Sequence, residues 1–244
     1  MSAAKDFPFY NDEPVAISGW GWLLVLAATA LGFYLLVGLP EWFEVFPLNY
    51  VPPLLFVGLP LAALAYVSKG QLGALFGGYG LKAFGLSVGF MLLTIVSSVV
   101  VAILLSRFLA FNANPSVNLL AGMSGSGLAL FLSQTFIQLL GEEVVTILPL
   151  LAVLWFCVQK LGLSRRAGLV VAVLLSTLWF GALHLPTYDW NLVQCFLVIG
   201  SARLVLTAAY LATRNLWVSF GAHLVNDWSI FLLSFAGSHL PIGS

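Results

Sequence analysis

Long apolar stretches dominate this sequence and limit what it can fold into. A helix needs about 20 apolar residues to cross the roughly 30 Å hydrocarbon core of a bilayer. Seven stretches are close to that length: 19–38, 50–67, 85–106, 127–148, 168–185, 191–211 and 215–234. Only 7% of the residues are charged, against about 25% in soluble domains, so lipid must cover much of the surface. We therefore predict an all-α, polytopic membrane helix bundle with about seven transmembrane helices.

Two segments depart from this simple pattern. The apolar run from Gly127 to Gln159 is too long for one ordinary span. Gly141 and Pro149 are its expected break points, where the helix bends or ends in a piece lying on the membrane surface. The stretch Gly70–Gly80 contains five glycines and is expected to be a loop or an interfacial segment.

The positive charges predict the orientation of the chain, because cytoplasmic loops of membrane proteins are rich in lysine and arginine. We predict that the N-terminal segment 1–18 lies in the cytoplasm. In this orientation Arg107 is the one cation in an outer loop. An aromatic cluster suits the outer interface: Trp42, Phe43, Phe46 and Tyr50. The inner loops hold the other cations: Lys5, Lys69, Lys82, Lys160, Arg165, Arg166 and Arg214.

Charge and cysteine usage exclude some classes of partner and site. The net charge is zero and no basic or acidic tail is present, so we expect no nucleic-acid partner. Cys157 and Cys195 both lie in apolar runs and are interpreted as small packing residues.

A few ionisable residues lie inside the predicted spans. Each costs about 2.5–3.5 kcal/mol on insertion scales, so such residues persist when they are paired, hydrated or functional. All of them come from the second half of the chain, and Asn226 accompanies them: Glu142, Glu143, His184, Arg203, His223 and Asp227.

Spacing indicates how these side chains are directed. Glu142 and Glu143 are about 100° apart around a helix, so one can face a cavity while the other binds elsewhere. The alternative is that both simply bond to neighbouring helices. Phe180 lies one turn before His184 and can wall off its imidazole, although this histidine alone is more typical of a satisfied helix interface.

A third polar group lies in the last span. Asn226 and Asp227 follow His223 by three and four residues, so all three share one helical face. They offer an array of hydrogen-bond donors or a histidine–carboxylate pair. The alternative is a structural polar zipper between helices.

These motifs, in this order and on separate spans, resemble the CPBP intramembrane proteases, which include the CAAX prenyl endopeptidases and many bacterial relatives. The matching residues are Glu142-Glu143, Phe180-x-x-x-His184 and His223-x-x-x-Asp227. The resemblance implies a catalytic core over 127–234, preceded by transmembrane helices without a motif over 19–126. A tail over 235–244 would follow.

One position departs from the family pattern. The family arginine is expected at position 147, where this chain has Ile147. Arg203 is the obvious substitute, because a lone cation inside a span needs an anion. We predict that Arg203 pairs with Glu143 or Asp227.

The resemblance implies hydrolysis of a peptide bond in a membrane-associated protein or peptide, in the inner membrane of a bacterium. Glu142, helped by His184, would activate a water, and His223 with Asp227 or Asn226 would bind the developing oxyanion. No cofactor is expected. Zinc held by Glu142, His184 and His223 remains the rival chemistry.

Two other functions stay open. Ile147 fits an inactive relative that acts as a membrane scaffold or as an immunity or regulatory protein. Buried ionisable groups also build proton-coupled transporters, although no inverted repeat is visible.

A shared site for the two histidines meets one geometric difficulty. His184 lies near the outer end of its span, and His223 lies about 12 Å from the inner end of its own. For the two to meet, a helix must tilt, shift or begin deeper than drawn.

Overall fold

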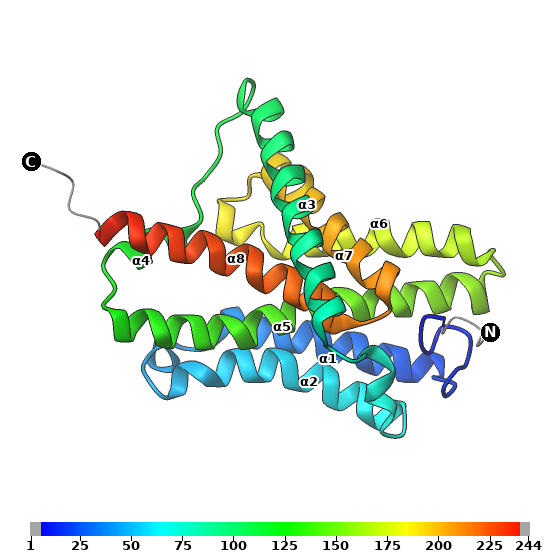
Figure 1. The fold of residues 1–244 in the computed structure, drawn as a ribbon. Helices are drawn as coiled ribbons and strands as arrows, with labels where there is room; N and C mark the ends of the chain where they lie inside the picture. Colours follow the sequence, from blue (N-terminus) through cyan, green and yellow to red (C-terminus); the bar gives the residue numbers. More distant parts are fainter. Residues whose placement is uncertain (1–5, 240–244) are drawn as a thin grey trace, which may run out of the picture.

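The computed structural model describes residues 6–239, and all its regular structure in that range is helical (Figure 1). The longer helices are α1 (Gly19–Gly38), α2 (Val51–Val67), α3 (Leu81–Ser106), α4 (Pro115–Ala121), α5 (Gly125–Trp155), α6 (Arg165–Leu183), α7 (Gly200–Thr213) and α8 (Leu216–His239). The short helical segments are η1 (Glu41–Glu44), η2 (Leu48–Tyr50), η3 (Gln71–Leu75), η4 (Phe156–Lys160), η5 (Pro186–Tyr188) and η6 (Gln194–Ile199). Within the described range, 6 helical segments are long and apolar enough to cross a membrane. The prediction of a polytopic all-α bundle is confirmed.

The predicted seventh span is α8, which is not among those six segments. Its 24 residues exceed the length of a span, but His223, Asn226 and Asp227 lower its hydropathy. α8 also continues past the predicted start of the tail, because Phe235 to His239 belong to the helix. The rest of the predicted tail, 240–244, lies outside the described residues.

Helix α5 is the centre of the bundle. It packs against α1 and α2, and also against α6 and α8. Figure 1 shows α5 in green running along much of the molecule, with the α1–α2 pair below it and α6 and α8 above it. α3 crosses α8 steeply and packs on both α7 and α8. The second half of α5 is buried almost throughout, so the polar residues it carries lie inside protein.

α5 runs unbroken through Gly141 and Pro149, so the prediction that the helix ends at one of them is wrong. Gly141 faces Phe56 of α2, and a Cβ atom there would collide with the Phe56 ring. The glycine therefore serves close helix packing. Pro149 has no N–H for the carbonyl of Val145, but the indole Nε1–H of Trp179 donates to that oxygen at 3.2 Å. This replacement partner lets the helix continue past the proline.

The glycine-rich stretch 70–80 consists of η3 and an extended segment, as the glycines predicted. Asn215, at the turn between α7 and α8, accepts a hydrogen bond from Gly77 N at 2.8 Å and donates to Gly78 O at 3.1 Å. A Cβ atom on Gly77 would come within 2.9 Å of the Asn215 side chain. The half of the chain without motifs is thus attached directly to the start of α8.

The N-terminal segment folds back over one end of the bundle. Its aromatic residues Phe7, Phe9 and Tyr10 are buried. Phe7 stacks on Tyr210 of α7, and the guanidinium groups of Arg165 and Arg214 lie over its ring. This segment covers the turn between α7 and α8 and holds two arginines at the same end of the molecule.

An ion pair fixes the start of this segment and gives a prediction. Asp6 Oδ1 lies 2.6 Å from Arg165 Nη2. Burial alone would raise the pKa of Asp6, but hydrogen bonds from Arg165 and Tyr10 lower it to about 2. Since this folded-state pKa is below the unfolded value, the pair stabilises the protein above about pH 4. That contribution is lost as the pH falls from about 4 to about 2.

We expect Asp6→Asn to reduce the free energy of unfolding at neutral pH by less than about 1 kcal/mol, because both partners are partly exposed. The variant should also lose the pH dependence of the thermal unfolding midpoint between pH 4 and pH 2, measured in detergent. Asp12→Asn, at an exposed position of the same segment, is the matched control. Equal pH profiles for the two variants would contradict a stabilising Asp6–Arg165 pair.

Candidate intramembrane active site

A cavity of about 330 Å³ opens beside the middle of α5. Residues from α3, α5, α6, α7 and α8 line it. Apart from Glu143, every site residue predicted from the sequence is among the lining residues: Glu142, Phe180, His184, Arg203, His223, Asn226 and Asp227. Side chains separated by as many as 85 positions in the chain thus share one hollow inside the bundle.

Glu142 lies between the two histidines. Its Oε2 atom is 3.9 Å from His184 Nε2 and 3.8 Å from His223 Nε2. The other oxygen, Oε1, accepts a hydrogen bond from Gln138 Nε2 at 3.2 Å. The two distances to the histidines are too long for direct hydrogen bonds and suit an oxygen atom placed between the groups.

The depth of α8 explains how the two histidines meet. From Glu142, α5 and η4 extend for 18 further residues, or about 27 Å. α6 returns over a similar distance from Arg165, which brings His184 back to the level of Glu142. α8 begins only about 10 Å before His223, so its first turn lies inside the bundle. Figure 1 shows α8 beside only part of α5, with the N-terminal segment beyond its start.

Glu143 points away from the cavity into a buried network. It is fully buried, and Arg203 of α7 pairs with both its oxygens, at 2.6 Å from Nη1 and 3.0 Å from Nη2. Ser219 Oγ donates to Oε2, and His223 Nδ1 donates to Oε1 at 2.9 Å. The predicted pairing of Arg203 with Glu143 is present. The divergence of adjacent carboxylates, expected from helix geometry, is present as well.

Arg203 compensates for the absence of an arginine at position 147. Ile147 is fully buried in the apolar core. The guanidinium that binds Glu143 comes instead from Arg203, which also donates to Thr207 Oγ1 at 3.2 Å and lies 5.1 Å from the Phe180 ring. A buried carboxylate without a cation is costly, and α7 supplies the cation that α5 lacks.

Both imidazoles are oriented through their Nδ1 atoms. His184 Nδ1 donates to the carbonyl of Phe180 at 2.9 Å, and His223 Nδ1 donates to Glu143. Each Nε2 atom is therefore left on the side of Glu142. The Phe180 ring packs 4.5 Å from the His184 ring and 6.4 Å from the His223 ring, so it walls the site as predicted.

Polar residues near the cavity complete the surroundings. Asn226 Nδ2 donates to Asp227 Oδ1 at 2.8 Å, and Asp227 Oδ2 lies 3.8 Å from His223 Nε2. Tyr188, in the loop after α6, also lines the cavity. Burial, reinforced by the charge of Asp227, raises the pKa of Tyr188 to about 12, so its phenol stays neutral.

Sequence reasoning missed three neutral partners: Gln138, Thr207 and Ser219. Each lies four residues from a charged or imidazole side chain on its own helix, namely Glu142, Arg203 and His223. That spacing places them on the same helical face. A search for polar residues one turn from each intramembrane charge would have found all three.

No group of three or more histidine, cysteine, aspartate or glutamate side chains within residues 6–239 is arranged to hold a metal ion. The zinc alternative stays a prediction. It is tested below by chelation.

One comparison with known proteins matches the segment of the chain that carries this site. Residues 124–229 match the family model described as type II CAAX prenyl endopeptidase Rce1-like. Searches of the curated proteins and of the solved structures found no similar protein. The matched range contains Glu142, Glu143, His184 and His223. Residues 124–229, less than half of the chain, are therefore similar to the CAAX-type intramembrane proteases.

Proposed function

We propose that this protein is an intramembrane endopeptidase that hydrolyses a peptide bond in a membrane-associated protein or peptide. The observation that carries the proposal is the position of Glu142 Oε2, 3.9 Å from one imidazole and 3.8 Å from another within a cavity of the bundle. A carboxylate and two imidazoles around one hollow supply a base and a donor for acyl hydrolysis.

Glu142 is the general base in this scheme. A water between Glu142 Oε2 and His184 Nε2 can donate one hydrogen bond to each. The water gives one proton to Glu142 while the water oxygen attacks the scissile carbonyl carbon. The C–N bond then breaks, and the departing amine takes the proton from Glu142. His184 suits this role because its Nδ1–H donates to the Phe180 carbonyl, so that Nε2 is an acceptor when the ring is neutral.

His223 faces the oxygen that becomes negative. Its Nδ1–H donates to Glu143, so its Nε2 donates to an oxyanion when the ring is an imidazolium. Three carboxylates surround such an imidazolium: Glu143 directly, and Glu142 and Asp227 at 3.8 Å. Asn226 holds Asp227 with one amide hydrogen and has a second hydrogen for the oxyanion.

Glu143 and Arg203 act as positioning residues. Both are fully buried. Arg203 borders the cavity but Glu143 does not, and the contact of Glu143 with the reaction passes through His223 Nδ1. An inactive scaffold is the second candidate, and Ile147 is the observation that favours it. The ion pair between Arg203 and Glu143 counts against that candidate, because Arg203 supplies the cation that Ile147 cannot.

The location of the site and the charges suggest where the substrate comes from. The cavity lies between membrane-spanning helices, so the substrate must reach it from the bilayer or its surface. Arg165 and Arg214 both contact Phe7, which gathers cations at the N-terminal end. This supports a cytoplasmic N-terminus. The inner membrane of a bacterium is proposed from the family resemblance alone.

The experiment is cleavage profiling of a library of membrane peptides with the purified protein in lipid, with and without a chelator. We expect cleavage by the wild type, none by Glu142→Ala, and no effect of the chelator. Loss of cleavage with the chelator and recovery on adding zinc would replace the metal-free mechanism. Absence of cleavage by the wild type, with a membrane partner still captured by Glu142→Ala, would favour the scaffold. Proton-coupled flux in proteoliposomes that depends on Glu142 would favour a carrier.

A further inference from the structure

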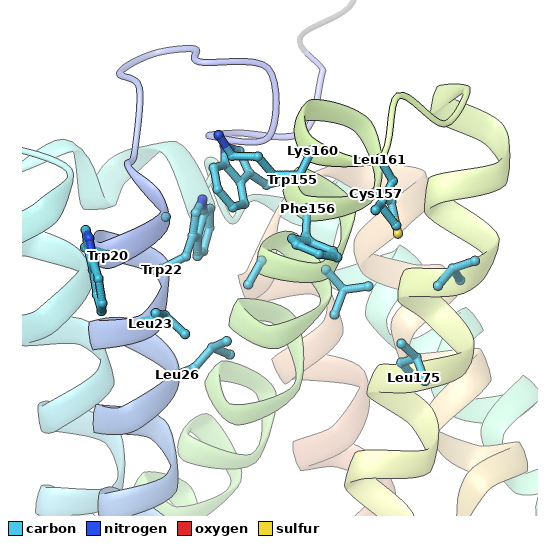
Figure 2. A pocket seen from close by; sticks show the side chains of 14 residues that line it. Trp20, Trp22, Leu23, Leu26, Trp155, Phe156, Cys157, Lys160, Leu161 and Leu175 are labelled. Carbon is cyan, nitrogen blue, oxygen red and sulfur yellow. The ribbon is translucent and has the colours of Figure 1, made fainter.

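A second, larger cavity lies on the side of the bundle that faces lipid. It is a groove of about 830 Å³ between α1, the end of α5 with η4, and α6. Figure 2 shows its floor and walls, formed by Trp22, Leu23, Leu26, Phe156 and Leu175. Trp155, at the end of α5, lies about 20 Å along the helix from Glu142, so the groove is separate from the active site.

One end of the groove is polar. Lys160 lines it, is exposed, and has its Nζ atom 5.2 Å from the centre of the Trp155 ring. Figure 2 shows the ring nitrogens of Trp20, Trp22 and Trp155 directed toward the same end as Lys160. Tryptophan and lysine are the residues that membrane proteins place at the level of lipid headgroups.

Trp22 gives an independent indication of a ligand. Its side chain is only 2% exposed, yet its indole Nε1 has no hydrogen-bond partner among residues 6–239. Buried indole N–H groups usually find an acceptor. An ester or phosphate oxygen in the groove would provide one.

We propose that this groove binds an anionic glycerophospholipid, with an acyl chain along the apolar wall and the phosphate group at Lys160. Basic pockets between transmembrane helices on the cytoplasmic side suit anionic headgroups. The apolar wall suits a chain and offers nothing to a soluble anion. The bound lipid joins α1, from the part of the chain without motifs, to α5 and α6 of the catalytic half.

Native mass spectrometry of the full-length protein in detergent tests this site. The probes are phosphatidylglycerol and phosphatidylcholine, with glycerol phosphate as the headgroup alone. We expect the wild type to bind phosphatidylglycerol about fivefold more tightly than phosphatidylcholine, as one lysine near the headgroup contributes. Lys160→Gln should remove that preference. Glycerol phosphate should not bind detectably.

Two further variants keep the result specific. Lys69→Gln, which removes an exposed cation outside the groove, should keep the fivefold preference. Leu175→Trp, which fills the groove, should weaken binding of both phospholipids. Equal binding of the two phospholipids by the wild type, or equal loss in Lys160→Gln and Lys69→Gln, would overturn the proposal. Unchanged binding in Leu175→Trp would show ordinary annular lipid and would overturn it too. Peptide cleavage is not read in this assay, so its failure leaves the proposed protease activity unaffected.

Discussion

Glu142→Gln is expected to lower kcat for peptide hydrolysis by about 10²–10⁴-fold, the range that a general base contributes. The amide has nearly the shape of the carboxylate and keeps an oxygen for the hydrogen bond from Gln138. It cannot accept the proton of a water between itself and His184. KM should change little, because the substrate backbone binds through other groups. The measurement is kcat and KM on the best peptide found by profiling.

Asp227→Asn is the matched control for this variant. It removes a carboxylate from the same cavity, 3.8 Å from His223 Nε2. We expect kcat within about tenfold of the wild type, since an oxyanion site tolerates an amide donor better than the base site does. If Glu142→Gln keeps more than a tenth of the wild-type kcat, or if the two variants fall equally, Glu142 is not the base.

The membership of the candidate site could be predicted because ionisable residues are rare inside spans. Each of the few that occur must find a partner or water, so Glu142, His184, Arg203 and His223 had to meet something polar. The positions of these side chains relative to one another could not be predicted from the sequence. It depends on how deeply each helix begins, and the start of α8 is set by Asn215 and by the covering N-terminal segment. Both contacts are long-range.

The local errors also have physical causes. Gly141 and Pro149 break helices when their neighbours offer no compensation. Here Phe56 fills the space beside the glycine, and Trp179 satisfies the carbonyl that the proline leaves free. The packing of Phe7 over the turn between α7 and α8 could not be predicted, because residues 6–17 contain no long apolar run. Its burial comes from two arginines and Tyr210, none of them near in sequence.

Arg203→Met is expected to cost about 3–5 kcal/mol in the free energy of unfolding, the usual penalty for breaking one side of a buried ion pair. Methionine keeps much of the side-chain volume but leaves Glu143 buried without its cation. Ser219 and His223 then share a carboxylate that is no longer neutralised. We expect kcat to fall as well, because His223 loses its fixed orientation. Reversible unfolding in detergent and peptide cleavage measure the two effects.

A second substitution tests whether Arg203 does the work of the missing family arginine. Ile147 lies four residues after Glu143, on the same face of α5, so an arginine there can reach the carboxylate from within its own helix. We expect Ile147→Arg to destabilise the wild type, since it adds an unpaired cation to the apolar core. In the Arg203→Met background the same change should recover part of the lost stability and cleavage. If Ile147→Arg is equally harmful in both backgrounds, the two positions are not interchangeable sources of one cation, and the pair in α5 and α7 has a different role.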